Sequence, residues 1–180
     1  INASHLYKPA TELRKKNRIK TIQSSLEIEG NTLTEEQITA LVENKRVLAP
    51  HKDILEVQNA IKVYKQLNEF NPLQLNDIDN AGKLRTTNVG IVKGSKVEHV
   101  APSGTMVNGL MKDLFAYLKK DNDLILIKSC VFHYEFEFIH PFLDGNGRMG
   151  RLWQTLILMQ QYPVFEYLPV ESLIKQKQSD

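Results

Sequence analysis

The chain has 180 residues, of which 42% are hydrophobic and 24% are charged, an ordinary globular composition that predicts one compact domain over residues 1–180. Lys and Arg number 23 against 21 Asp and Glu, and this formal net charge of +2 excludes a strong global field that would attract nucleic acid or an anionic membrane. Any phosphate chemistry must therefore come from local geometry.

Cysteine use and hydropathy indicate the compartment. The single cysteine, Cys130, lies in an apolar run and has no partner for an internal disulfide. We therefore expect a reducing, cytoplasmic location and a buried thiol that packs as a small hydrophobic group. No apolar run approaches the roughly 18 residues that span a bilayer, so no membrane is expected as a partner. Because the sequence opens at Ile1 without a methionine, we expect a fragment of a longer protein.

The first half of the chain has the apolar spacing of helices. The first helix is predicted from Glu12 to Glu29 and ends at Gly30, a residue type that commonly follows helices. The sequence Thr34-Glu35-Glu36-Gln37 has the spacing of a capping box and begins a second helix. A third stripe runs from Ile54 to Tyr64, and a fourth helix is expected from the Asn71-Pro72 start signal to Leu84.

The second half adds a β-hairpin to the helices. Two β-prone runs, Val89–Val92 and Val97–Val100, flank a Gly94-Ser95 turn, so a hairpin is predicted over residues 89–101. Helical stripes follow from Val107 to Leu118 and from Leu152 to Met159. Residues 124–139 are nearly continuously apolar, as in a central helix contacted on most sides. The predicted fold is mainly α, with one β-hairpin.

Residues 140–151 contain the groups that phosphate chemistry requires. Because Pro141 disfavours a helical conformation at the residue before it, His140 is expected at the exit of the central helix, free to face a cleft. Gly145 and Gly147 permit positive φ and close backbone approach, so the loop can turn its amides inward as an anion cradle before a helix N-terminus.

Charged side chains complete this segment. Arg148 and Arg151 lie three residues apart in the first turn of the next helix and can form charge-assisted contacts with phosphate oxygens. Asp144 supplies a carboxylate suited to a magnesium ion otherwise held by phosphates and waters. Together with His140 as a candidate base and with the anion cradle, these groups predict a phosphoryl- or nucleotidyl-transfer site.

The string HPFLDGNGRMGR over residues 140–151 resembles the signature of Fic proteins without departure at a defining position. The resemblance extends over roughly Leu13 to Leu173 and implies a Fic-type helical bundle with one β-hairpin flap. It also implies a protein adenylyltransferase that moves AMP from ATP onto a Ser, Thr or Tyr hydroxyl of a target protein.

The resemblance implies a role for each residue of the motif. His140 would be the general base that deprotonates the target hydroxyl, since an imidazole ordinarily titrates near neutral pH. Asp144 would bind the Mg²⁺ that bridges the α- and β-phosphates. The remaining motif residues would form the anion hole and hold the phosphate chain: Gly145, Asn146, Gly147, Arg148 and Arg151.

The predicted hairpin lies where the family has its substrate-positioning flap. Ile91, Val92, Lys93 and Gly94 would line the nucleotide site, and their strand could pair with an extended target segment through main-chain hydrogen bonds. From the residues alone, a hairpin that only covers the core is an equally good interpretation.

The segment Ser25-Leu26-Glu27-Ile28-Glu29-Gly30 resembles the family's inhibitory motif, Ser/Thr-x-x-x-Glu-Gly/Asn. This makes residues 12–30 an expected inhibitory helix, with Ser25, Glu29 and Gly30 as its motif positions. In the family the glutamate reaches the second arginine of the motif, so Glu29 would pair with Arg151 where the γ-phosphate should lie.

Other functions remain open at this point. Removal of AMP from modified proteins, or transfer of another nucleotide, would use the same motif. A non-catalytic nucleotide-binding regulatory module is the alternative from a different class, although an intact His140 argues against it. Self-modification and an oligomer are possible, and nucleic acid is expected only through a domain outside this chain.

Overall fold

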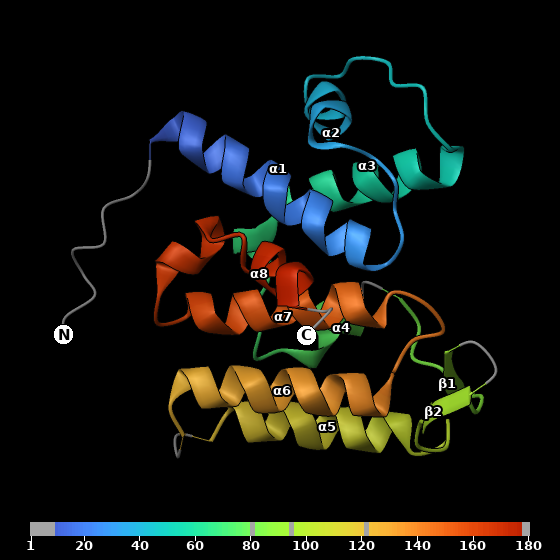
Figure 1. Ribbon diagram of the computed structural model, residues 1–180. Coiled ribbons are helices and arrows are strands. Elements are labelled where there is room, and N and C mark those ends of the chain that lie inside the picture. The colour runs from blue at the N-terminus through green and yellow to red at the C-terminus, as the bar shows by residue number, and fades with distance from the viewer. Residues whose placement is uncertain (1–9, 80–81, 94–95, 121–122, 178–180) are drawn as a thin grey trace. The chain divides into compact units, whose positions relative to one another are not determined.

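The computed structural model describes residues 10–79, 82–93, 96–120 and 123–177. They form two compact units, one made by Ile1–Glu69 with Tyr162–Asp180 and the other by Phe70–Gln161 (Figure 1). Each unit is described by itself below. The prediction of one domain over residues 1–180 stays a prediction.

The first unit is built around α1 (Thr11–Ile28), which contacts α2, α3, η3 and α8. Ile19, Ile22 and Leu26 of α1 are buried, whereas Leu13 is 49% exposed, so the apolar spacing expected for this helix corresponds to a buried face only from Ile19 onward. The other elements of this unit are α2 (Glu35–Val42), α3 (His51–Lys65), η2 (Leu67–Glu69), η3 (Pro163–Tyr167) and α8 (Val170–Lys177).

The end of α1 and the start of α2 follow the predicted capping pattern. Glu29 is the C-cap of α1, and Gly30 adopts the left-handed conformation with φ +89°. The Thr34 hydroxyl accepts a hydrogen bond from the Gln37 backbone N–H at 3.3 Å, and the Gln37 side chain accepts one from the Thr34 N–H at 3.0 Å. The capping box is therefore confirmed.

Polar contacts tie the C-terminal segment to α1. The Ser24 and Ser172 hydroxyls lie 3.0 Å apart and are buried, and Arg18 pairs with Glu166 at 3.0 Å. Asn17 also donates to the Tyr167 carbonyl at 2.9 Å. These contacts join α1 to residues about 150 positions later in the chain.

The second unit consists of α4, two strands and α5 to α7. Figure 1 shows α6 beside α5 and α7, and α6 packs against both. The core between these helices is aromatic: Phe115, Phe132, Phe136 and Trp153 are buried. The elements are α4 (Leu75–Asp79), β1 (Gly90–Lys93), β2 (Lys96–Val100), α5 (Val107–Leu118), α6 (Ile125–Ile139) and α7 (Asn146–Met159).

The segment between α4 and α5 is less helical than predicted. The fourth helix ends at Asp79 and does not reach Leu84, because the chain there runs as an irregular segment with hydrogen bonds to distant loops, such as Arg85 N–H to the Pro141 carbonyl at 2.8 Å. The two strands lie at the predicted runs and pair antiparallel, with a register shift at Ile91/Val92. The predicted turn at 94 and 95 lies outside the described residues.

Residues 124–139 were predicted to form a helix contacted on most sides. The helix is confirmed, but the prediction that most of its sides are covered is wrong. One of its faces stays apolar and exposed: Ile127 is 49% exposed and Tyr134 67%. Cys130 lies on this face and is exposed, contrary to the buried thiol we expected, because it is roughly 200° around the helix from the buried Phe132. Within the described part of the chain, no helix combines the length and apolarity needed to cross a membrane.

A close backbone contact in the second unit gives a stability test. A Cβ atom at Gly104 would lie 2.2 Å from the Thr86 carbonyl group, whereas one at Gly109 in α5 would meet open space. We expect Gly104→Ala to lower the free energy of unfolding by about 2 kcal/mol or more, because two backbone segments must separate. Gly109→Ala, the matched control, should raise it by up to about 1 kcal/mol through helix propensity. Urea unfolding measures both, and equal effects would contradict the contact.

Candidate functional site

His140 is placed by the end of α6. It is the C-cap of this helix, and its backbone is left-handed, with φ 50° and ψ 62°. Its N–H still donates to the Phe136 carbonyl at 2.9 Å, so the helix closes while the chain reverses toward Pro141. The predicted exit of His140 from the helix is confirmed. A left-handed non-glycine residue costs on the order of 1–3 kcal/mol and persists only where its surroundings hold it.

Arg85 holds the backbone at His140 in this conformation. Its guanidinium donates to the carbonyls of His140 and Ile139 at 2.7 and 2.9 Å, and also to those of Thr87 and Pro102, each at 2.7 Å. The side chain is 3% exposed, and this burial lowers the pKa of the guanidinium from its ordinary value. The cation lies at the C-terminal end of α6, where the carbonyl dipoles favour positive charge.

Sequence analysis missed Arg85. The residue lies between Leu84 and Thr86 in an irregular segment, about 55 positions before the histidine that it supports. No spacing rule connects it with residues 140–151, because its partners are backbone carbonyls, which every residue type carries. Only the folded structure shows that it positions His140.

Asn146 closes the loop that follows His140. Its side-chain oxygen accepts from the Phe142 N–H at 2.8 Å, and its amide nitrogen donates to the Phe142 carbonyl at 2.9 Å. Asn146 is 2% exposed. Both polar groups of its side chain are therefore bonded within the loop. Only its backbone N–H could contribute to the anion hole predicted for this residue. Phe142 is buried, and the centroid of its ring lies 6.3 Å from that of Phe136, so this side chain packs against α6.

The predicted anion cradle lies at the start of α7. Gly145 is the N-cap of this helix and takes the left-handed conformation, with φ +84°. Gly147 lies in the first turn and is helical, so of the two glycines only Gly145 uses a positive φ. The first N–H groups of a helix have no acceptor within it, so those of residues 146 to 148 are suited to an anion.

Two charged groups flank the cradle. Arg148 and Asp144 form an ion pair of 2.9 Å, in which the Asp144 side chain is 87% exposed. One exposed carboxylate beside a helix end suited to an anion is compatible with Mg²⁺, which takes most of its ligands from phosphates and waters. The residues that the structure describes contain no group of three or more His, Cys, Asp or Glu able to hold a metal by themselves. Arg151, one turn further along α7, is 7% exposed.

Below the loop, α6 and α7 approach each other closely at Gly150. A Cβ atom there would lie 2.5 Å from Glu137 Oε1 and 3.2 Å from His133 Nδ1. Burial lowers the pKa of His133, and the positive charge of Arg151 lowers it further. His133 therefore lies at the helix crossing in surroundings that disfavour its charged form.

The structure brings most of the predicted site together in one unit. His140, Asp144, Gly145 and the arginines come from the end of α6, one loop and the start of α7. Ile91, Val92 and Lys93 lie in β1 of the same unit, while Gly94 lies outside the described residues. Ser25, Glu29 and Gly30 belong to the other unit, so the pairing of Glu29 with Arg151 stays a prediction.

Comparison with known families and structures gives a consistent result. Residues 51–158 match the Fic/DOC family. The chain is 30% identical over 183 residues to the protein adenylyltransferase Fic of Nematostella vectensis and 29% identical over 176 residues to protein adenylyltransferase fic-1 of Caenorhabditis elegans. In each case the match covers 84% of this chain. It covers 41% of the Nematostella relative and 34% of the C. elegans relative.

A solved structure resembles the whole fold. A Fic family protein from Desulfovibrio desulfuricans is 47% identical, with a TM-score of 0.89 over 95% of this chain and 56% of that one. A signalling protein from Bacteroides thetaiotaomicron with a Fic domain shares the fold at 19% identity, with a TM-score of 0.72 over 82% of this chain and 64% of that one. The chain thus spans well under half the length of the two curated relatives and about half of the first solved structure.

The loop closure by Asn146 predicts a local stability effect. Asn146→Ala leaves the Phe142 N–H and carbonyl without partners, so the free energy of unfolding should fall by about 2 kcal/mol or more. Hydrogen exchange of the Phe142 amide should become much faster, and urea unfolding gives the total effect. The matched control is Asn108→Ala, at an exposed asparagine of α5, which should change stability by less than about 0.5 kcal/mol. Unchanged protection of the Phe142 amide would contradict the closure.

Proposed function

Because this chain belongs to the Fic/DOC family, we propose that it transfers AMP from ATP to a hydroxyl group of a target protein. The observation that carries the proposal is the placement of His140, whose left-handed backbone ends α6 just before the loop that leads to the anion cradle. A base beside a phosphate site is what nucleotidyl transfer requires. The curated relatives named above as protein adenylyltransferases support it.

The triphosphate is held by the start of α7. The N–H groups of residues 146 to 148 point along the helix axis toward the anion, and the helix dipole favours negative charge there. Arg148 and Arg151 add charge-assisted hydrogen bonds to the phosphate oxygens. Positive charge in the first turn of a helix is ordinarily unfavourable, and a bound anion removes that penalty.

The chemical step uses His140 as the general base. The imidazole takes the proton of the target hydroxyl, whose oxygen forms a bond to the α-phosphorus of ATP. The bond from that phosphorus to the oxygen bridging the α- and β-phosphates breaks, and pyrophosphate leaves. The products are an AMP ester of the target and a protonated imidazole, which returns its proton to solvent.

Asp144 is the residue that would hold magnesium. When bound, Mg²⁺ neutralises the charge of the phosphates and stabilises the leaving pyrophosphate. In the structure the Asp144 carboxylate contacts Arg148 at 2.9 Å. If Asp144 held the metal, its carboxylate would leave this ion pair, and the Arg148 guanidinium would be available to phosphate.

The flap, residues 89–101, supplies a docking edge for the target. Among the described residues, β1 pairs with β2 alone, so its other edge can accept an extended segment by main-chain hydrogen bonds. Such pairing depends on the backbone of the target and not on its sequence. It would position a serine, threonine or tyrosine of the target near His140. Ile91 to Gly94 would also line the nucleotide. The same route permits self-modification.

We further propose that α1 is an inhibitory helix that acts through Glu29. This carboxylate lies at the C-cap of α1, directly before the left-handed Gly30, so it is carried at the helix end. Paired with Arg151, it would satisfy the guanidinium that the γ-phosphate needs and would repel that phosphate. ATP would then bind weakly or in an unproductive pose.

Other aspects of the protein's setting stay predictions. A cytoplasmic location is supported by the use of a single cysteine in the chain. An oligomer, and contact with nucleic acid through a domain outside this chain, are compatible with the near-neutral charge balance. The target protein is a partner that exposes a hydroxyl to the flap.

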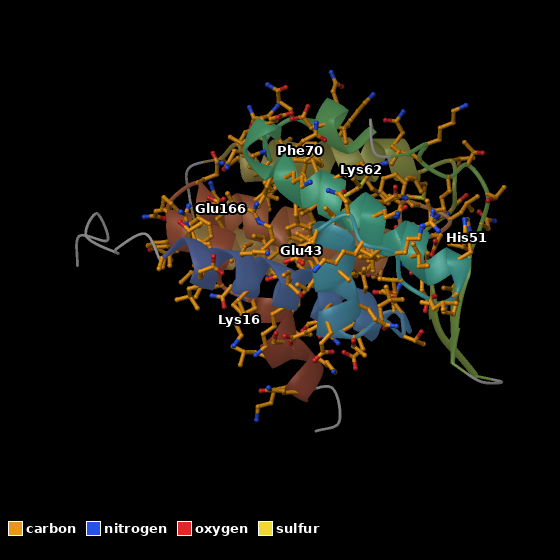
Figure 2. All side chains as sticks on the ribbon, turned by 90° about the horizontal axis from the view of Figure 1, so that it is seen from above. Lys16, Glu43, His51, Lys62, Phe70 and Glu166 are labelled. Atoms are coloured by element: carbon orange, nitrogen blue, oxygen red, sulfur yellow. The ribbon has the colours of Figure 1, made fainter. Side chains whose placement is uncertain are left out.

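The role of His140 is tested by substitution. His140→Ala should abolish transfer of label from ATP carrying ³²P at the α-position, by about a hundredfold or more, while ATP binding measured by calorimetry stays within a few-fold. The control is His51→Ala, at an exposed histidine of α3 (labelled in Figure 2), which should retain transfer. Undiminished labelling by the His140 variant would sink the proposal.

The inhibitory role of Glu29 is tested by its removal. Glu29→Gly should raise transfer, including self-modification, by about tenfold or more, equivalent to about 1.4 kcal/mol on the productive complex. Glu12→Gly makes the same chemical change at the opposite end of α1 and should leave the rate unchanged. Equal incorporation of label by wild type and the Glu29 variant would contradict the inhibitory role of Glu29.

A further inference from the structure

The first unit contains a pocket that the proposed reaction does not use. It has a volume of about 480 Å³ and lies between the N-terminal half of α1, the end of α3 and η3. Pockets that hold small organic ligands are typically about 300–1,000 Å³. All of its lining residues belong to this unit, and none belongs to the motif of residues 140–151.

The charges around this pocket are unbalanced. Its lining holds four cationic side chains and one carboxylate. Arg18 pairs with that carboxylate, Glu166, at 3.0 Å, and Lys15 pairs with Glu43 at 2.9 Å. Figure 2 labels both glutamates. In the described part of the chain, the remaining two cations, Arg14 and Lys65, form no ion pair.

Arg14 is held in place but is not neutralised. Its Nη2 donates to the Thr11 hydroxyl at 3.1 Å, and its guanidinium carbon lies 5.6 Å from the centroid of the Tyr167 ring. Its Nε is buried and has no hydrogen-bond partner among the described residues. A buried donor without an acceptor is costly, and an anion in the pocket would supply that acceptor.

The remaining wall of the pocket is apolar. Ile19, Ile22 and Ile61 are buried side chains that line it, and Tyr167 adds an aromatic ring. An inorganic anion would satisfy the cations but would leave this wall against water. A ligand with both an apolar body and a negative group would use both parts.

We propose that this pocket binds a small organic anion, a carboxylate or phosphate attached to an aromatic or aliphatic body. Arg14 and Lys65 would bind the anionic group, and the isoleucines with Tyr167 would contact the body. The site does not rest on the adenylyl transfer proposed above, since it shares no residue with that machinery and is tested by binding alone.

Phenyl phosphate is the probe, because it combines a phosphate with a ring. Titrated into the ¹⁵N-labelled chain, it should cause saturable shifts of amide resonances in the N-terminal half of α1, around residues 61–68 and around residues 166–167. Inorganic phosphate and benzyl alcohol, which carry one part each, should bind at least about tenfold more weakly, because each lacks one set of contacts.

Substitutions assign the binding to the two cations. Arg14→Gln and Lys65→Gln should each raise the dissociation constant for phenyl phosphate by at least about tenfold. The matched controls are Lys16→Gln and Lys62→Gln, which remove the same charge from exposed positions of the same helices outside the pocket (Figure 2). They should leave the dissociation constant within about twofold, since exposed charges contribute little at moderate salt.

Several results would each overturn the proposal. These are the absence of phenyl phosphate shifts around the pocket, shifts that map to residues 140–151 instead, and control variants that weaken binding as much as the pocket variants. Arg14→Gln changes a side chain that also contacts Tyr167, so a folded Lys65→Gln protein with unchanged affinity would overturn the proposal even if the Arg14 variant failed to fold.

Discussion

The C-terminal end of α6, where His140 lies, depends on one buried cation and its four carbonyl partners. Arg85 binds the carbonyls of residues 139 and 140 together with those of Thr87 and Pro102, and so fastens three chain segments at one point. Without it, the left-handed backbone of His140 would lose the contacts that offset its conformational cost. The direction in which the imidazole leaves the helix is therefore set through the backbone that Arg85 holds.

Two arginines lie near the start of α7, beside the loop that follows His140. Arg148 lies in the first turn of α7, where a helix ordinarily carries acidic groups, and pairs with Asp144 at 2.9 Å, while Arg151 follows in the next turn. Burial lowers the pKa of the neighbouring His133, and the charge of Arg151 lowers it further. The triphosphate proposed to bind here would bring its negative charge beside these two cations.

Local rules predicted the helices, the capping box and the loop, because those features depend on neighbours within a few positions. The capping box at Thr34 and the left-handed Gly30 and Gly145 are of this kind. The helical Gly147, the side-chain bonds of Asn146, the bonds of Arg85 and the early end of α4 depend on partners or packing that spacing does not report. The exposed apolar face of α6 was misread because hydrophobicity alone cannot separate a buried face from an uncovered one.

The paired hydrogen bonds between the Asn146 side chain and the Phe142 backbone have a consequence for the timing of nucleotide capture. They tie the loop to itself, so the curvature of the cradle exists before any ligand arrives. These residues lose their conformational entropy when the protein folds, so ordering them does not weaken binding. Association at this loop should therefore follow the behaviour of a rigid receptor, with discrimination among nucleotides left to the surrounding walls.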